Sequence, residues 1–349
     1  MKGAKVIGIL AVLALTFVAC GDEEEQAPGR PPPNPQSPWK VAFDFYHGEP
    51  GATAGFGGLE FTGPNNGWAC AKDRVFRYDG QRWRLHTNLG ERFPSYSVSL
   101  FSLSAPAAAD VWVGGEISGP GDPHLFHYDG SSWTAVSTGV SGVVYVNDAF
   151  FLAPDKGWVA TSYYWQNPDN GRILFYDGKS WTRQLDGPDI RELYIVSEND
   201  GWACGQYEDA ERLYRWDGSS WREVNVPGEP VTEYLALDFT GPNDGWMLAS
   251  RLGGTSKGAL FHYDGSTWTE VNCPMRSGGD CGFVSPTYGW LADSYVSSWL
   301  YDDGRFTSYP WPWNNLGWIE ICACGKDDVW AGTGGIEGHA YILHFTGFR

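Results

Sequence analysis

The sequence lacks the apolar stripe at helical spacing that amphipathic helices need, and it is poor in basic residues. Its 24 lysines and arginines stand against 42 aspartates and glutamates, which gives a net charge of −18 at neutral pH. Nucleic acid is therefore a poor partner, because its phosphates would be repelled. Glycine (46), proline (22) and tryptophan (19) are abundant, as expected for turns and half-buried strands. We expect an all-β protein with little helix.

The sequence also lacks catalytic motifs. There is no Gly-x-Ser-x-Gly element, phosphate-binding loop, paired set of zinc ligands or Asp-x-Asp-x-Asp-Gly calcium loop. His127, His262 and His344 share one position of an internal repeat, which indicates a structural role. We therefore expect a protein that is not an enzyme and has no cofactor and no metal site. Propeller active sites are assembled from distant blades, so an open cleft with converging carboxylates would favour an enzyme.

The N-terminus is typical of an exported protein. Lys2 and Lys5 precede the apolar run Val6–Val18, which is short for a membrane span, so residues 1–19 are predicted to be a signal peptide. The segment Phe17-Val18-Ala19-Cys20 resembles the bacterial lipobox, which implies lipidation at Cys20. An ordinary signal peptide with Cys20 merely nearby is the alternative.

Residues 20–36 are predicted to be a tether. They combine an acidic run with a proline-rich run, and such a composition cannot bury a core. We expect a protein of the bacterial cell envelope that touches the membrane only through its lipid anchor. The anchor could place it on the outer membrane or cell surface, and a periplasm-facing position is also open.

A tryptophan repeat fills residues 37–349. A Gly-Trp or Val-Trp pair recurs at intervals of 40 to 46 residues, a period typical of propeller blades. The repeated tryptophans are Trp68, Trp112, Trp158, Trp202, Trp246, Trp290 and Trp330. Each repeat contains four apolar segments separated by turn residues, and the third and fourth are joined by Tyr-Asp-Gly-x-x-Trp or a variant of it. The sequence therefore predicts one seven-bladed β-propeller with four-stranded blades.

The last repeat is incomplete. Phe345-Thr346-Gly347 aligns with Tyr-Asp-Gly, so the tryptophan that should follow falls just past Arg349. At the other end, Ser37-Pro38-Trp39 resembles the start of an outer strand. We predict that residues 38–43, with Trp39 in the tryptophan position, close the last blade as its outer strand and remove the exposed edge of an open ring.

The Gly/Val-Trp strand followed by Tyr-Asp-Gly-Ser-Ser-Trp resembles the repeats of bacterial secreted and lipoprotein β-propellers, a loose family mostly without assigned activity. The repeat is kelch-like at Val111–Gly115, where a double glycine follows the tryptophan. It is also similar to the Asp-box of sialidases, although here the aspartate directly precedes the glycine. This resemblance implies a fold and not an activity.

Six of the seven cysteines remain if Cys20 carries lipid. Cys273 and Cys281 flank a connection whose ends must converge, so we predict a disulfide between them in an oxidising compartment. Cys322 and Cys324 are interpreted as small buried apolar residues.

Aromatic residues outside the repeat positions are the candidate binding residues. They lie in connections of variable length, beside carboxylates and asparagines, and their rings suit a sugar face or apolar side chains of a peptide. They are Tyr163, Tyr164, Trp165, Tyr207, Tyr295, Trp311 and Trp313. An equally good interpretation has Trp311 and Trp313 plugging the channel or covering a blade edge.

These observations predict a monomeric, membrane-anchored binding or scaffold propeller whose ligand is a glycan or a protein. The alternatives are a structural or assembly factor of the envelope and a polysaccharide hydrolase or lyase.

Overall fold

The protein is described from a computed structural model. Contacts divide the chain into Met1–Arg30 and Pro31–Arg349, and every residue described below belongs to the second unit. The structure describes residues 32–47, 55–122, 124–141, 143, 145–162, 171–207, 210–251, 257–276, 279–293, 296–317, 319–334, 338–345 and 347. Residues 1–31, including the predicted signal peptide and Cys20, lie outside this range.

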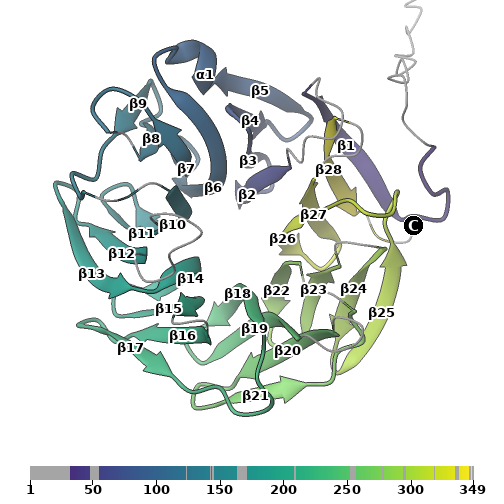
Figure 1. The fold of residues 1–349 in the computed structure, drawn as a ribbon. Helices are drawn as coiled ribbons and strands as arrows, with labels where there is room; N and C mark the ends of the chain where they lie inside the picture. Colours follow the sequence, from purple (N-terminus) through teal and green to yellow (C-terminus); the bar gives the residue numbers. More distant parts are fainter. Residues whose placement is uncertain are drawn as a thin grey trace, which may run out of the picture. The chain divides into compact units, whose positions relative to one another are not determined.

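The described chain is built from antiparallel sheets that stand around a central axis (Figure 1). The first sheet along the chain contains β2 (Phe56–Gly63), β3 (Asn66–Ala71), β4 (Arg74–Tyr78) and β5 (Trp83–Asn88). The next strands are β6 (Ser97–Ala107), β7 (Asp110–Ser118), β8 (Leu125–Tyr128), β9 (Trp133–Val136), β10 (Tyr145–Ala153), β11 (Lys156–Ser162), β12 (Gly171–Tyr176) and β13 (Trp181–Gly187).

The second half of the ring continues in the same way. One sheet contains β14 (Asp189–Ser197), β15 (Asp200–Tyr207), β16 (Ala210–Trp216) and β17 (Trp221–Val224). The next contains β18 (Glu233–Gly241), β19 (Asp244–Arg251), β20 (Lys257–Tyr263) and β21 (Trp268–Val271). It is followed by β22 (Cys281–Ser285), β23 (Tyr288–Ala292), β24 (Ser297–Asp302) and β25 (Arg305–Pro310). The last contains β26 (Ile319–Gly325), β27 (Asp328–Thr333), β28 (His339–Phe345) and β1 (Trp39–Tyr46).

The prediction of seven blades is wrong. The structure has five four-stranded blades, and strands β6 to β13 form one eight-stranded sheet instead of two further blades. The join is the pairing of Tyr145 in β10 with Glu116 in β7. Two features allow this pairing. The end of β7 runs past its partner β8. Gly114 leaves room for Val146, because a Cβ atom at position 114 would come within 2.5 Å of Val146 Cγ1. The double glycine of the kelch-like segment therefore lies where two repeats merge.

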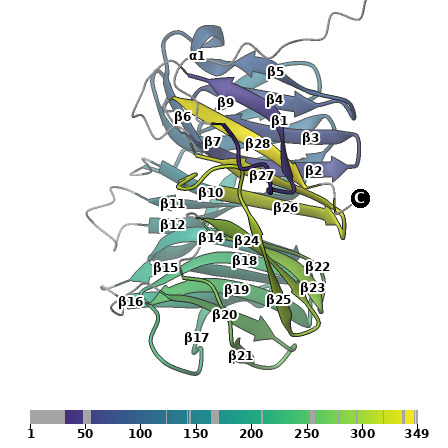
Figure 2. The ribbon, with the colours of Figure 1, turned by 90° about the vertical axis from the view of Figure 1, so that its right-hand side faces the viewer.

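Strand β1 pairs antiparallel with β28 and is the outer strand of the sheet β1-β28-β27-β26 (Figure 2). Trp39 lies opposite Phe345, and a bulge between Val41 and Phe43 shifts the register. The chain just before β1 is also bound to the ring, because the Ser37 hydroxyl donates to the Pro310 carbonyl at 2.8 Å. Sequence positions at the two ends of the chain are thus neighbours in one sheet.

The repeated tryptophans form the core between successive sheets. All seven are at most 3% exposed, and each lies near the start of the second strand of its repeat, within a buried stretch. Trp246, for example, stacks flat on Phe283 of the next blade at 4.2 Å. These large rings fill the wedge between twisted sheets, as propeller packing requires.

The Asp-Gly turns have the chemistry that the sequence predicts. In β16–β17, the backbone N–H groups of Ser219 and Ser220 both donate to Asp217 Oδ1 at 2.9 Å. These bonds and that of the Ser219 hydroxyl lower the pKa of Asp217 to about 2. Gly218 next to it has a φ of 87°, a left-handed conformation that glycine adopts without strain.

Helix is confined to one short element in the described residues, α1 (Leu89–Arg92). Asn88 caps it, because the Glu91 N–H donates to Asn88 Oδ1 at 3.1 Å. Within the described part of the chain, no helix has the length and apolar character needed to cross a bilayer.

Candidate functional site

A cavity of about 1080 Å³ lies on the axis of the ring and is lined by the innermost strands. Six carboxylates line it, and only two basic side chains, Lys72 and Arg191, accompany them. The carboxylates are Glu60, Asp148, Glu192, Asp238, Asp280 and Glu320. The cavity is therefore an acidic binding space made by distant parts of the sequence.

These carboxylates occupy two repeat positions. Glu60 and Asp238 stand eight residues before a repeated tryptophan, and Asp148, Glu192, Asp280 and Glu320 stand ten before one. Residues two apart in an extended strand share a face, so both positions can point to the axis. The β6 repeat has serines, Ser102 and Ser104, at both positions. The acidic lining is thus a property of the repeat, and the β6 repeat is the exception.

Most of the inward side chains also join neighbouring sheets. Residues at the first position accept a backbone N–H from the next inner strand: Ala105 donates to Glu60 Oε2 at 2.8 Å, and Phe283 donates to Asp238 Oδ2. The Phe151 N–H donates to the Ser104 hydroxyl at 3.0 Å in the same way. Each bond satisfies a donor on the open edge of an inner strand.

Carboxylates at the second position, two residues earlier in the strand, accept backbone N–H groups from the next inner strand in the same way. The Leu193 N–H donates to Asp148 Oδ2 at 2.8 Å, and the Ile321 N–H donates to Asp280 Oδ2 at 2.7 Å. Asp280 also accepts the Cys281 N–H at 2.7 Å through Oδ1. These carboxylates act as clamps between sheets as well as lining the cavity.

Glu192 differs from the clamps, because no hydrogen bond of its carboxylate is found within the described part of the chain. Its pKa is raised well above the usual range, first by burial and then by the negative charges of Asp148, Asp280, Glu320 and Asp238. Glu192 thus lies among negative charges and has no hydrogen bond from the described residues to offset them.

Four of the other cavity carboxylates also have raised pKa values. Burial raises the pKa of Glu60 to about 7, and the charge of Asp148 adds to the effect while the bond from Ala105 opposes it. Burial likewise raises the pKa values of Asp148 and Asp238 to about 6, against the lowering effect of their backbone hydrogen bonds. Burial and the charge of Glu320 raise the pKa of Asp280. A cation in the cavity would relieve this repulsion.

The basic side chain nearest to Glu192 in sequence, Arg191, is already paired. It donates to Glu211 Oε1 at 2.6 Å and lies 3.4 Å from Glu233 Oε1. Glu211 in turn accepts the Tyr234 N–H at 3.0 Å, so this ion pair joins β14–β17 to β18–β21. Arg191 therefore strengthens the ring and leaves much of the cavity charge uncompensated.

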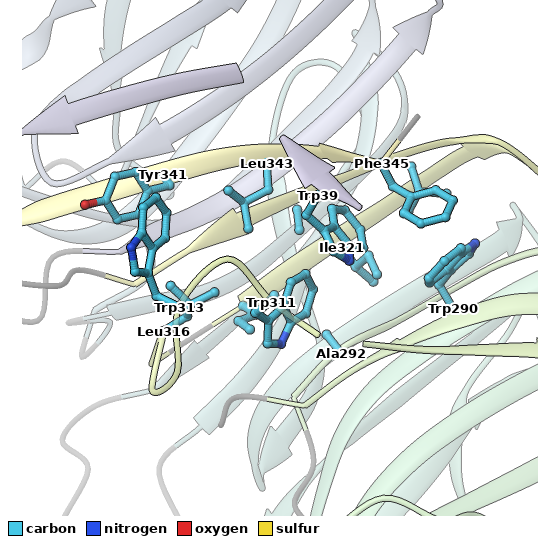
Figure 3. Close-up of a cluster of buried hydrophobic side chains, with 13 residues drawn as sticks. Trp39, Trp290, Ala292, Trp311, Trp313, Leu316, Ile321, Tyr341, Leu343 and Phe345 are labelled. Carbon is cyan, nitrogen blue, oxygen red and sulfur yellow. The ribbon is translucent and has the colours of Figure 1, made fainter. Parts of the chain in front are cut away.

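Trp311 and Trp313 are buried, so the structure favours the packing interpretation that the sequence also left open. They are 1% and 5% exposed and lie in the hydrophobic cluster where β22–β25 meets the sheet of β1 (Figure 3). Trp311 packs on Trp39 at 4.7 Å and donates its indole N–H to the Asp293 carbonyl at 2.7 Å. Trp313 stacks on Tyr341 at 4.6 Å. Both rings pack in the cluster between these two sheets.

The remaining aromatic candidates are only partly described. Tyr207 ends β15, is half-buried and lies over Gly187 of β13, outside the cavity lining. Tyr163, Tyr164, Trp165 and Tyr295 lie outside the described residues. A surface formed by these rings stays a prediction.

The predicted disulfide between Cys273 and Cys281 is not formed, and both are free thiols. The ends of this connection are held by backbone bonds instead, since the Gly258 N–H donates to the Met275 carbonyl at 3.1 Å and the Ala292 N–H to the Asp280 carbonyl at 2.8 Å. Burial raises the pKa of the Cys273 thiol to about 11. Across the described residues, no three histidine, cysteine, aspartate or glutamate side chains converge in a way that could hold a metal ion.

The carboxylate lining was missed from the sequence, although a signal for it exists. An acidic residue recurs eight or ten positions before six of the seven repeated tryptophans. A single aspartate or glutamate in an apolar strand is easily taken for a turn residue, and only its recurrence in register marks it as inward-facing.

Comparison with known proteins supports the fold. No protein-family model matches the chain, and no curated protein sequence matches it either. Among solved structures, YCF48 bound to a D1 peptide is 18% identical, with a TM-score of 0.62, over 91% of this chain and 99% of that one. YCF48 from Cyanidioschyzon merolae is 16% identical, with a TM-score of 0.59, over 88% and 98% of the two chains.

A third similar structure is the extracellular domain of a putative one-component system from B. thetaiotaomicron. It is 12% identical, with a TM-score of 0.61, over 88% of this chain and 40% of that one. At such identities the likeness establishes the fold alone. The protein is an all-β β-propeller.

Proposed function

We propose that the protein is an extracytoplasmic binding propeller that holds a basic segment of a protein ligand in its acidic central cavity. The observation that carries this proposal is the lining of the cavity, in which six carboxylates with two basic residues surround about 1080 Å³. The raised pKa values of Glu60 and Glu192 mean that their ionised forms are unfavourable in the cavity. A lysine or arginine side chain would stabilise that charge and be stabilised by it.

The similar structures support a protein ligand in this proposal. YCF48 is described as bound to a D1 peptide, so a propeller of this shape accommodates a peptide. The similarity to an extracellular domain supports a position outside the cytoplasm. The aromatic residues Tyr163, Tyr164, Trp165, Tyr207 and Tyr295 are proposed to extend the binding surface, and a glycan remains the other ligand class that they suit.

The signal peptide 1–19, the lipid on Cys20 and the tether 20–36 are part of the same proposal, as is a monomeric state. At its described end the tether is tied to the ring, because the Asn34 N–H donates to the Pro312 carbonyl at 2.6 Å before β1 begins. Metabolic labelling with a fatty acid should mark the wild type and not Cys20→Ser. Equal labelling of both would refute the anchor.

The cavity proposal is tested by titrating the protein with a hexalysine peptide and following heat release. Glu192→Gln removes a carboxylate that has no hydrogen-bond partner among the described residues, and we expect it to weaken binding about tenfold. Glu229→Gln is the matched control, because Glu229 is exposed in the connection after β17 and the change in net charge is the same. Equal affinities of the two variants would mean that the peptide binds the surface field and not the cavity.

A polysaccharide hydrolase or lyase is the second candidate. It is favoured by one observation, the pair Glu60 and Asp148, whose pKa values of about 7 and about 6 suit proton transfer near neutral pH. Both carboxylates are also clamps, which a structural role explains. Release of reducing sugar from an envelope polysaccharide, lost in Glu60→Gln, would establish this candidate.

A further inference from the structure

Two cysteines stand two positions apart on β26, the innermost strand of the last sheet. The Sγ atoms of Cys322 and Cys324 are 3.9 Å apart. Cys322 lines the central cavity. Cys324 is exposed to solvent, so its interpretation as a buried apolar residue is wrong. The structure thus places two thiols together at the wall of the cavity, and one of them is open to solvent.

The repeat explains why both side chains are found there. Cys322 stands eight residues before Trp330, the position that Glu60 holds in the first repeat, and both residues line the cavity. Cys324 follows two residues later, and residues two apart in a strand share a face. The register of β26 against β27 also shifts at Cys324. This strand therefore carries two thiols where the first repeat carries a carboxylate.

A disulfide between the two thiols is disfavoured by geometry. Disulfide sulfurs are about 2.05 Å apart, and the Cα atoms of residues two apart in an extended strand are separated by about 6.4–6.8 Å, the upper limit for a disulfide. Thiol–disulfide exchange also needs a thiolate. The pKa of Cys322 is raised well above its usual range, first by the hydrogen bond with Cys324 and then by burial. The pair is therefore poorly suited to redox exchange.

The surroundings of the pair favour a cation. The negative charge of Glu60, in the neighbouring sheet, acts on the Cys322 thiol. Glu320 stands two residues before Cys322 and lines the same cavity, and the chain has a net charge of −18. Negative charges attract cations, and a metal ion deprotonates a thiol that coordinates it. A metal cation can thus replace the protons of both thiols.

The number of ligands selects the metal. Thiolates favour soft ions such as Cu⁺ and Zn²⁺ over Mg²⁺ and Ca²⁺. Zn²⁺ usually takes four ligands, and among the described residues no third histidine, cysteine, aspartate or glutamate side chain completes a metal site with the pair. Cu⁺ is satisfied by two thiolates. With metal–thiolate bonds of about 2.3 Å the two sulfurs are at most about 4.6 Å apart, and their separation of 3.9 Å lies within this limit.

We propose that Cys322 and Cys324 form a two-thiolate binding site for Cu⁺ at the wall of the central cavity. As the ion binds, each Sγ atom forms one bond to copper and releases its proton to solvent, and no electron is transferred. The site does not depend on the peptide ligand proposed for the cavity, and it can be tested without that peptide.

The test uses the full chain, reduced and kept free of oxygen, and the coloured complex of Cu⁺ with bicinchoninate. We expect the wild type to withdraw one Cu⁺ per chain from this complex. Cys324→Ser should bind Cu⁺ at least about 100-fold more weakly, because it removes one of the two ligands. Cys273→Ser is the matched control, since it removes a partly buried thiol in the connection after β21 and should leave the uptake unchanged.

Two further measurements distinguish this site from other sources of copper or thiol chemistry. X-ray absorption of the copper-loaded chain should show two sulfur neighbours. Because Cys324 is exposed, Cys324→Ser should keep the urea midpoint of the wild type, so a loss of copper in this variant reports the ligand and not the fold. Equal uptake by the wild type and Cys324→Ser, no uptake by either, or Zn²⁺ bound as tightly as Cu⁺ would overturn the proposal.

Discussion

Carboxylates that face the axis differ in whether a backbone N–H group donates to them. This difference decides whether replacing the carboxylate lowers or raises the free energy of unfolding. Asp280 accepts two backbone N–H groups, from Cys281 and from Ile321 of the next sheet. We expect Asp280→Ala to lower the free energy of unfolding by about 1–3 kcal/mol, because both donors lose their acceptor. Urea unfolding measures the change, and Asp280→Asn, which keeps one acceptor oxygen, should lose less.

Glu192 provides the opposite case. Its carboxylate makes no hydrogen bond within the described residues, and its charge lies near other negative charges. Glu192→Gln should therefore raise the urea midpoint at pH 8 or leave it unchanged. A clear decrease would show that Glu192 has a structural partner after all.

At the scale of single elements, strand β1 depends on Trp39. The ring is 2% exposed, contacts Trp290, Trp311 and Phe345, and donates its N–H to the Ser298 hydroxyl at 2.9 Å. We expect Trp39→Ala to destabilise the protein by about 3–5 kcal/mol, through the cavity that it leaves. Trp39→Phe keeps most of the packing and should lose far less. An unchanged melting curve for Trp39→Ala would mean that β1 does not stabilise the ring.

The tight turns are tested by a matched pair of glycines. Gly218 has a φ of 87°, and a side chain there would come within 2.8 Å of Asn199 Oδ1, whereas nothing lies within 4 Å of the corresponding point on Gly241. Gly218→Ala should destabilise the protein by about 1–2 kcal/mol, because an L-residue is strained at positive φ. Gly241→Ala should be nearly neutral in the same denaturation assay, and equal losses would contradict the argument.

For the whole molecule, the cavity predicts an unusual dependence of stability on pH. The folded-state pKa of Glu60 is about 7, above its ordinary value of 4.5, so the folded protein binds more protons than the unfolded chain between these values. Stability should therefore be fully present below about pH 4.5 and fall as pH rises to about 7. The raised pKa values of Asp148 and Asp238 act in the same direction.

Urea midpoints measured from pH 4.5 to pH 8 test this expectation. Burial lowers the pKa values of His86 and His124, which by itself makes stability rise with pH over part of the range. Glu60→Gln is the control, because it keeps both histidines and should show a shallower fall than the wild type. Identical slopes would show that Glu60 does not titrate in this window.

The strands and turns of the ring could be predicted from the sequence because their causes are local. Asp217 and Gly218 form their turn with residues two or three positions away, and the tryptophan of each second strand is recognisable from its glycine or valine neighbour. The pairing position of Trp39 also followed from a missing residue in the last repeat. Such features recur because the same short-range chemistry recurs.

The number of blades was mispredicted, and the role of Trp311 was left open, because the period of a repeat says nothing about contacts between repeats. Two repeats merged into one sheet because Gly114 allows Val146 to approach, a contact across 32 positions of the sequence. Trp311 is buried because β1 returns from the other end of the chain to cover it.

By itself, the sequence determined an all-β repeat with defined strands and turns, since these depend on neighbours within a few residues. Only the tertiary structure decided that six carboxylates from separate repeats share one cavity. Residues such as Glu60 and Glu320 lie far apart along the chain, and curvature of the sheets around one axis brings them together. Burial and the charges of the other carboxylates raise the pKa of Glu192 only once that ring has closed.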